Sequence, residues 1–370
     1  MKTIRFLPIL ILFLILSLIH AICSKETHNA WENRDLSSYP SFSISSFLSG
    51  SYSEKMEQAL NDHMPKRDGF QHLHALSQYV LGVREVNGVL IGNQQLYQKS
   101  EVVDEIKWKA LAENLNAFAK KNHGIRFDFL LVPSKSGVIV PDHLKAMLKQ
   151  ETYNQSWFLN QLSDDFYIFD AKKALLESQR NDLYYRGDHH WTTHGAYVVY
   201  DAWRRQRKLN SQLSYETLTV NDAFYGTLSN RSGFFLKDRL EIYQSDEQLT
   251  YLIRYVEEQE QSSSLYVKEK QYSANPYEVF LGGNHARVDI DIANDYNRTL
   301  LLIKDSYANC FVPFLLPHYQ KIIIIDPRLS YDRLQSIIFE EDITEIMFLY
   351  NTYTFFHDIS LYDMMDSEMN

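Results

Sequence analysis

Two short stretches of the chain contain the residue types of a nucleophilic catalytic site. Residues 188–191 read Asp-His-His-Trp, and residues 304–309 read Lys-Asp-Ser-Tyr-Ala-Asn. A serine hydroxyl becomes a nucleophile when a histidine takes its proton, and a carboxylate on the other ring nitrogen then stabilises the imidazolium. A carboxylate two residues before a histidine can reach it within one loop. These residue types therefore predict a triad of Ser306, His190 and Asp188.

The position of Ser306 supports a catalytic role but also allows a simpler one. Ser306 follows an apolar run that predicts a strand and precedes a segment that predicts a helix. Backbone N–H groups near Tyr307, at the start of such a helix, can stabilise an oxyanion. A serine in this place can also serve as a helix N-cap, and so can the carboxylate of Asp305. Both interpretations stay open at this point.

The histidines also allow a metal site. His190 and His194 are four residues apart, a spacing that places two ligands on one helical face, and Asp188 would be a third ligand. The pattern lacks a glutamate beside His190, and Gly195 weakens a continuous helix through it. His189 and His194 also fit a core position and a helix cap. The favoured serine mechanism predicts no metal and no other cofactor.

Aromatic residues surround the predicted site and are candidates for stacking against a sugar. Tyr184, Tyr185, Trp191 and Tyr307 lie in or beside the two stretches. Aromatic faces bind sugars, but they pack cores equally well. Trp191 fits a position beneath the site at least as well as one on its surface.

The segments around these stretches predict an α/β fold. Helical spacing of apolar residues predicts helices around residues 108–118 and 196–203. Continuous apolar strands that alternate with helices indicate a mostly parallel sheet covered on both faces, which binds ligands at the carboxyl ends of its strands. The predicted strands are residues 127–132, 166–169, 300–303, 322–325 and 346–350.

The N-terminus predicts export. Lys2 and Arg5 precede an apolar run over residues 6–19, and Ala21 and Cys23 provide the small residues of a cleavage site. Residues 1–24 are therefore a signal peptide, or a signal anchor if uncleaved, and the remainder is extracytoplasmic, either membrane-anchored or secreted. A lipoprotein signal fits poorly, because Ile22 and His20 precede the cysteine.

The exported part divides into an extension and a main domain. Residues 25–100 predict an N-terminal extension with a stalk, a short helix near residues 53–63, and a hairpin at Asn87-Gly88. Residues 101–370 predict the catalytic domain. Residues 245–278 are rich in Glu, Gln, Ser and Lys and predict a polar surface insertion within it.

Composition excludes several classes of protein. The 370 residues include 37 Lys and Arg against 47 Asp and Glu, for a net charge of −10, and no basic run is present, which argues against nucleic acid as a partner. A hydrophobic content of 45% and a charged content of 23% are those of a globular protein. Because Cys310 is the one cysteine beyond Cys23, the exported part has no intrachain disulfide.

The chain resembles a known bacterial family. Asp188-His189-His190-Trp191 is the signature from which the DHHW family takes its name, and that family is similar to SGNH-hydrolase-like proteins that O-acetylate alginate and other polysaccharides. The resemblance implies a three-layer SGNH-like fold in a permuted order, with Asp188 and His190 before Ser306. It extends over most of the exported chain, at residues 63–68, 85–88, 132–135, 282–284, 304–309 and 326–328.

The resemblance also implies an activity and partners. Ser306 would carry an acetyl group that a polytopic membrane acyltransferase donates, and a polysaccharide hydroxyl would accept it. Gly226 and Asn284 are candidates for the oxyanion site beside the Tyr307 N–H. Lys304-Asp305 departs from the Gly-Asp of ordinary SGNH nucleophile blocks. The alternatives are a carbohydrate acetylesterase with the same triad, and a noncatalytic surface protein that binds polysaccharide.

Overall fold

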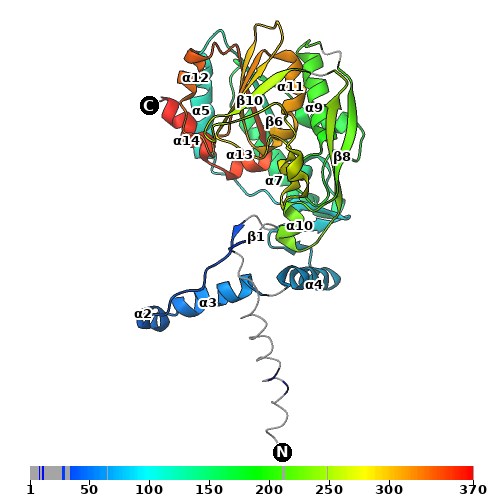
Figure 1. Cartoon of the computed structure of the whole chain (residues 1–370), viewed down its shortest axis with the longest axis vertical. Coiled ribbons are helices and arrows are strands. Elements are labelled where there is room, and N and C mark those ends of the chain that lie inside the picture. Colours follow the sequence, from blue (N-terminus) through cyan, green and yellow to red (C-terminus); the bar gives the residue numbers. More distant parts are fainter. Residues whose placement is uncertain are drawn as a thin grey trace, which may run out of the picture.

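A twisted eight-stranded sheet forms the centre of the protein in this computed structural model (Figure 1). The structure describes Pro8, Ile11 and residues 27–29, 34–64, 66–210, 213–247 and 249–369. The five strands from β14 to β7 pair in parallel, and the other three pair antiparallel. In spatial order the strands are β11 (Glu260–Ser262), β10 (Tyr251–Tyr255), β12 (Arg287–Ile292), β14 (Lys321–Ile325), β13 (Thr299–Lys304), β15 (Glu345–Asn351), β6 (Arg126–Val132) and β7 (Phe166–Ile168).

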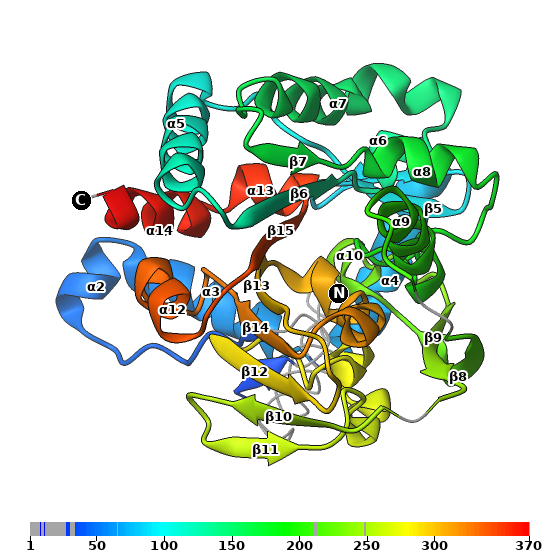
Figure 2. The ribbon, with the colours of Figure 1, turned by 90° about the horizontal axis from the view of Figure 1, so that it is seen from above.

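Helices cover both faces of the sheet (Figure 2). Successive side chains of β13 alternate between two cores: Leu300 and Leu302 pack in one, and Leu301 and Ile303 in the other. The first core includes α8 (Ala171–Glu177), α9 (Thr193–Gln206) and α11 (Val312–Leu315). The second includes α5 (Glu105–Lys121), α7 (Lys145–Leu159), α12 (Leu334–Glu340), α13 (Thr352–His357) and α14 (Ser360–Met369). The predicted α/β class with a mostly parallel sheet is confirmed.

The local signals in the sequence explain these elements. The Asp104 side chain accepts hydrogen bonds from the first N–H groups of α5, whose apolar face is fully buried, and Asn122 ends the helix. Each predicted strand is present within one or two residues of its expected ends. The connections also contain α6 (Lys135–Val138) and the 3-10 turns η2 (Asp142–Leu144), η3 (Lys268–Tyr272), η4 (Pro276–Val279), η5 (Ser306–Cys310) and η6 (Leu316–His318).

Part of the segment predicted as a polar insertion, residues 245–278, belongs to the central sheet. β10 pairs along its length with β12, and the Ile253 side chain is fully buried. In β10 the buried Ile253 and Tyr255 alternate with the more exposed Leu252 and Arg254, and polar residues dominate the chain on both sides of this five-residue strand. Because so short a strand contributes little to the composition of the segment, composition alone hides it.

The N-terminal part adds smaller elements. The predicted hairpin is present: β3 (Glu85–Val86) pairs with β4 (Val89–Gly92), and Asn87 and Gly88 between them have φ values of 50° and 73°. β5 (Gln95–Gln98) is the third strand of this sheet. The other elements outside the main sheet are β1 (His28–Asn29), β2 (Arg34–Asp35), α2 (Ile44–Leu48), α3 (Ser51–Asp62), α4 (Arg67–Val80) and the β8–β9 ribbon (Tyr215–Phe224 and Asp238–Ser245), whose strands α10 (Thr227–Ser232) connects.

The predicted signal segment, residues 1–24, lies outside the described residues apart from Pro8 and Ile11. Among the helices of the described part, none has the length and apolar character needed to cross a membrane.

Candidate active site

The carboxyl end of the central parallel strand β13 carries Ser306. The strand ends at Lys304, and Ser306 is the first residue of η5, where its side chain stays partly exposed. Asp188 and His190 lie on the loop between α8 and α9, closed by a bridge between Tyr184 and Trp191. The turn after β13 and this loop meet at the edge of the sheet where α/β proteins bind ligands.

Three predicted residues form a continuous hydrogen-bond chain. His190 Nε2 lies 2.8 Å from Ser306 Oγ, and His190 Nδ1 lies 2.6 Å from Asp188 Oδ1. Because a carboxylate oxygen accepts, Nδ1 carries the proton and Nε2 is left as the base that faces the serine hydroxyl. The geometry is that of a serine poised for deprotonation.

The environment of Asp188 keeps it ionised. Its Oδ1 also accepts the His190 N–H at 2.9 Å, and its Oδ2 accepts the Thr227 N–H at 2.6 Å. Burial raises the pKa of Asp188. The positive charges that His189 and His190 carry when protonated and the hydrogen bonds from His190 outweigh burial and hold the pKa of Asp188 well below its ordinary value. Burial lowers the pKa of His189 to about 3, with the charge of His190 acting in the same direction.

Gly226 serves Asp188 rather than Ser306. A Cβ at Gly226 would lie 2.1 Å from the Asp188 Cβ, so no larger residue fits there. The missing side chain lets the Thr227 N–H approach the carboxylate. Gly226 was a candidate for the oxyanion site, and the structure places it behind the carboxylate instead.

The Tyr307 N–H does not match its predicted role either. Asp305 Oδ1 accepts it at 2.9 Å, and Asp305 Oδ2 accepts the Asn351 N–H at 2.9 Å. Asp305 is therefore the cap at this turn, one of the two interpretations that the sequence left open. The N–H that was expected to hold an oxyanion is already used to shape the turn that carries Ser306.

Asn284, the third oxyanion candidate, is hydrogen-bonded to the segment that carries Ser306. Its Oδ1 accepts from Lys304 Nζ at 3.0 Å and from Asn309 Nδ2 at 3.1 Å, so these two residues of the β13–η5 segment fix the amide. Asn284 is exposed. Because both bonds engage the oxygen, the Nδ2 group of Asn284 points away from them and is left to donate.

Tyr277 contacts His190 and was missed by the sequence interpretation. Its ring lies flat on the imidazole, with centroids 3.8 Å apart and an angle of 13° between the planes. Its hydroxyl lies 3.4 Å from the Ser306 carbonyl oxygen. Tyr277 belongs to η4, at the end of the segment that the sequence predicted as a polar insertion, where its neighbours gave no signal.

The four aromatic residues expected to stack on a sugar are buried: Tyr184, Tyr185, Trp191 and Tyr307 expose at most 4% of their surface. They brace the site from inside instead. Trp191 Nε1 donates to the Tyr307 carbonyl at 2.9 Å, and the Tyr307 hydroxyl donates to the His189 carbonyl at 2.5 Å. The prediction of a stacking surface was wrong for the three tyrosines, whereas Trp191 takes the alternative position beneath the site. Large aromatic side chains near the sheet edge gain more from packing in the core.

The metal alternative is not supported in its predicted form. His194 Nδ1 lies 2.6 Å from the Tyr243 hydroxyl, and His194 is not among the clustered ligand atoms. Within the described residues, Asp188, His189 and His190 form a cluster whose possible ligand atoms lie within 4.8 Å of one another. Both ring nitrogens of His190 are already bonded to Asp188 and Ser306, so a metal ligand role would require breaking the chain.

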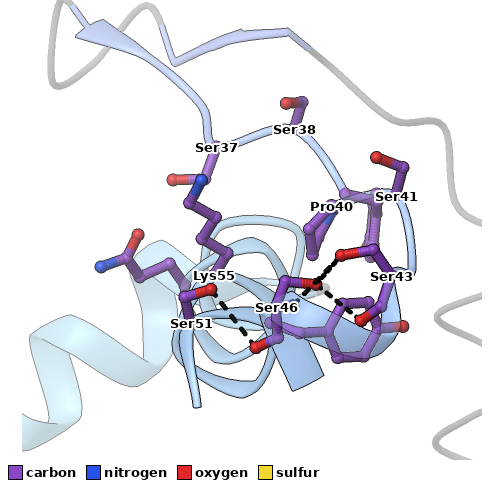
Figure 3. Close-up of a pocket in the computed structure, with 11 residues that line it drawn as sticks. Ser37, Ser38, Pro40, Ser41, Ser43, Ser46, Ser51 and Lys55 are labelled. Carbon is purple, nitrogen blue, oxygen red and sulfur yellow. Dashed lines mark hydrogen bonds between the residues drawn. The ribbon is translucent and has the colours of Figure 1, made fainter. Parts of the chain in front are cut away.

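The structure contains one cavity beside this site and another in the N-terminal part. One of about 760 Å³ lies beside the Asp188 loop and is lined by residues including Tyr185, Arg186, His194 and Glu241. Another, of about 660 Å³, lies in the N-terminal part (Figure 3) and is lined largely by serines such as Ser37 and Ser43. The second cavity contains none of the predicted site residues.

Comparison with solved structures shows the fold. A DHHW family protein from Eubacterium siraeum superposes with a TM-score of 0.66 at 22% identity, covering 76% of this chain and 96% of that one. Bacillus cereus PatB1, solved with a sulfonyl adduct, gives a TM-score of 0.63 at 18% identity, with 75% and 99% covered. The O-acetyltransferase domain of Pseudomonas putida AlgJ gives 0.44 at 14% identity, with 76% and 99% covered.

Sequence comparison identifies the family. No curated protein matches the chain. The family model described as DHHW protein matches residues 142–325, a region that contains the whole Ser306–His190–Asp188 chain of hydrogen bonds. The resemblance inferred from the motifs is therefore confirmed: residues 142–325 of the chain, which include the predicted triad, match the DHHW family.

Proposed function

We propose that this protein is an O-acetyltransferase that acts on a cell-surface or exported polysaccharide. The observation that carries the proposal is the pair of hydrogen bonds of His190, at 2.8 Å to Ser306 and 2.6 Å to Asp188. A serine activated in this way forms acyl-enzymes. The resemblance of the DHHW family to polysaccharide O-acetylating proteins supports acetyl as the group and a sugar hydroxyl as the acceptor.

The reaction proceeds in two balanced halves. Ser306 Oγ attacks the acetyl carbonyl carbon while His190 Nε2 takes its proton; the bond to the donor's leaving group breaks, and His190 gives that proton to the leaving group. A sugar hydroxyl then attacks the acetyl-serine, again losing its proton to His190. The Ser306–acetyl bond breaks, and the proton returns to Ser306 Oγ. Asp188 stabilises the imidazolium in both halves.

Asn284 is the proposed oxyanion donor. Its oxygen is held by Lys304 and Asn309, so its Nδ2 group is preorganised before substrate arrives. A donor that needs no reorganisation stabilises the tetrahedral intermediate most effectively, and losing one such donor costs about 10²–10³-fold in kcat. This assignment replaces the Tyr307 N–H and Gly226.

The remaining predictions on context are part of the proposal. The N-terminal segment, with its two basic residues and apolar run, supports action outside the cytoplasm. A serine enzyme in that compartment needs an acetyl donor delivered across the membrane. A polytopic membrane acyltransferase is the proposed donor partner.

A sulfonyl reagent tests the nucleophile directly. Bacillus cereus PatB1 accommodates a sulfonyl adduct, and sulfonyl fluorides modify activated serines. We expect phenylmethylsulfonyl fluoride to add once to the full chain, at Ser306, by peptide mass spectrometry. Ser178, whose hydroxyl caps the end of α8 by donating to the Leu175 carbonyl, should stay unmodified.

The activity test uses an activated acetyl ester with and without oligosaccharide. Ser306→Ala should lower ester cleavage and transfer at least about 10³-fold, because the residual rate comes from binding and oxyanion contacts alone. Ser178→Ala is the matched control and should keep the wild-type rates. Rapid acetate release from acetylated polymer with no transfer to any oligosaccharide would establish an esterase, and a Ser306→Ala variant with wild-type rates would exclude both enzymes.

A further inference from the structure

A buried lysine contacts the loop that carries Asp188. Lys135 follows strand β6 and begins α6, and only 3% of its surface is exposed. Its Nζ donates to the carbonyl oxygens of Leu96 at 2.9 Å, Arg186 at 3.0 Å and Asp188 at 3.4 Å. An ammonium group has three N–H donors, and here each one has a carbonyl acceptor.

The surroundings of this ammonium compensate its charge only in part. Within the described residues Lys135 forms no ion pair. Its charged neighbours are Asp238 on β9 and Asp188 and Arg186 on the loop, and His189 is a further titratable neighbour on that loop. From β5 the Tyr97 ring faces it at 5.6 Å. Asp238 itself is engaged by Arg186 and by the Gly187 N–H. An apolar side chain of similar length would fill the same space without the cost of burying a charge.

The backbone of Lys135 is itself fixed from helix α7. Glu151 on α7 accepts the Ser134 N–H at 2.6 Å and the hydroxyl groups of Ser134 and Ser136. Glu151 is 1% exposed. The residues on either side of Lys135 are therefore fixed to helix α7, and the Lys135 side chain extends from this fixed backbone toward the loop.

The three acceptors lie on two separate segments. Leu96 belongs to β5, and its N–H donates to the Arg186 carbonyl at 2.9 Å. Arg186 and Asp188 flank Gly187 on the loop. Lys135 therefore lies where β5, the loop and the sheet meet, and it binds the carbonyl groups of the two residues that flank Gly187.

We propose that Lys135 is a positioning residue, whose ammonium ties the Arg186 and Asp188 carbonyls to β5 and so sets the orientation in which the Asp188 carboxylate meets His190. The inference rests on the proposed catalytic roles of Asp188 and His190. Without the ammonium, the Asp188 peptide group can rotate, and the hydrogen bond to His190 Nδ1 loses its alignment. A misplacement of about 1 Å at a catalytic group costs about 10²-fold in rate.

The test compares Lys135→Met with wild type in the full chain, using 4-nitrophenyl acetate. We expect kcat to fall about 10- to 100-fold while KM changes less than about twofold. The ¹⁵N spectrum of the histidine rings, with His190 assigned through His190→Gln, should change from a single Nδ1–H form to a mixture of tautomers. This second readout needs no turnover, so it distinguishes failure of this inference from failure of the proposed function.

Arg207→Met is the matched control. Arg207 is also a largely buried cation, paired with Asp128 at 3.1 Å and with Glu345 at 3.5 Å. These contacts join the end of α9 to β6 and β15. The Arg207→Met variant should have a lower free energy of unfolding than wild type, but its folded fraction should keep the wild-type kcat and the wild-type ¹⁵N spectrum of His190. If Lys135→Met does not fold, Lys135→Gln, which still donates two hydrogen bonds, should show the same changes more weakly. A folded Lys135 variant with wild-type kcat and an unchanged His190 spectrum would overturn the inference.

Discussion

The candidate site has two halves: the turn after β13 that carries Ser306, and the loop that carries Asp188 and His190. A buried lysine contacts each half, and the two lysines differ in their partners. Lys304, on the Ser306 side, lies 3.2 Å from the Asp326 carboxylate, which Arg328 also contacts at 2.6 Å. Lys135, on the Asp188 side, donates to three main-chain carbonyls. A carboxylate compensates a buried ammonium as a full charge, whereas carbonyl dipoles do so only in part.

Because the two lysines have different partners, the two halves of the site should respond to different perturbations. Burial lowers the pKa of both lysines, and for Lys304 the charge of Asp326 is the main opposing influence. Burial lowers the pKa of Lys135 to about 7, against the weaker opposition of Asp238 and Asp188. The Ser306 half is therefore expected to depend on its ion pair for stability, and the Asp188 half to depend on pH.

Breaking the ion pair should produce the largest effect on stability. Asp326→Asn leaves the buried Lys304 and the largely buried Arg328 without their carboxylate, so we expect the free energy of unfolding to fall by about 3–5 kcal/mol. Urea denaturation followed by circular dichroism measures the change. Asp182→Asn is the matched control, because it breaks an exposed pair with Arg180 that is worth less than about 1 kcal/mol. Equal losses of unfolding free energy in Asp326→Asn and Asp182→Asn would show that Lys304 does not depend on its ion pair, and the contrast with Lys135 would then be lost.

The pH dependence of stability should separate the two halves next. Lys135 has a folded pKa of about 7, below its ordinary value of 10.5, so the folded state binds fewer protons than the unfolded state between these values. Stability from this group therefore rises with pH above about 7, and the full cost of burying the ammonium is present below that pH. Between about pH 6 and about pH 9 we expect wild type to gain about 2–3 kcal/mol relative to Lys135→Met. Urea denaturation of both proteins at the two pH values measures this change. The same difference in the free energy of unfolding between wild type and Lys135→Met at both pH values would contradict the prediction.

The sequence predicted the features that depend on local pattern. Asp188 and His190 share one loop and Ser306 follows an apolar strand, so spacing and strand order brought these residues together without knowledge of distant contacts. Asn284 was named as an oxyanion candidate through the family resemblance alone, because the hydrogen bonds that fix its amide come from Lys304 and Asn309 on another segment and no local pattern indicates them. The burial of the aromatic residues could not be predicted either, since the sequence does not distinguish a ring beneath the site from a ring on its surface.

Lys135 and Tyr277 were missed for a related reason. Lys135 lies 53 residues from Asp188 in the sequence, and its acceptors are carbonyl groups, which every residue type provides. Tyr277 follows a polar segment whose strands β10 and β11 were themselves not predicted. Such contacts depend on the tertiary fold, and no spacing rule within a single sequence indicates them.

The smallest expected effect concerns Tyr277, which contacts His190 between the two halves. Its ring covers one face of the imidazole at 3.8 Å, and the face of an aromatic ring stabilises a cation by about 0.5–2 kcal/mol. Because the imidazolium forms in both half-reactions, Tyr277→Leu should lower kcat by about 2- to 30-fold. Tyr277→Phe keeps the ring and loses the hydroxyl, which makes a long hydrogen bond of 3.4 Å to the Ser306 carbonyl and a hydrogen bond with the Cys310 thiol. Its kcat should stay within about twofold of wild type. Tyr255→Leu is the matched control, because it removes a buried ring beside His285, at 4.4 Å, away from Ser306. A Tyr277→Leu variant as active as Tyr255→Leu would show that the ring only fills space, whereas equal losses in Tyr277→Phe and Tyr277→Leu would assign the effect to the hydroxyl.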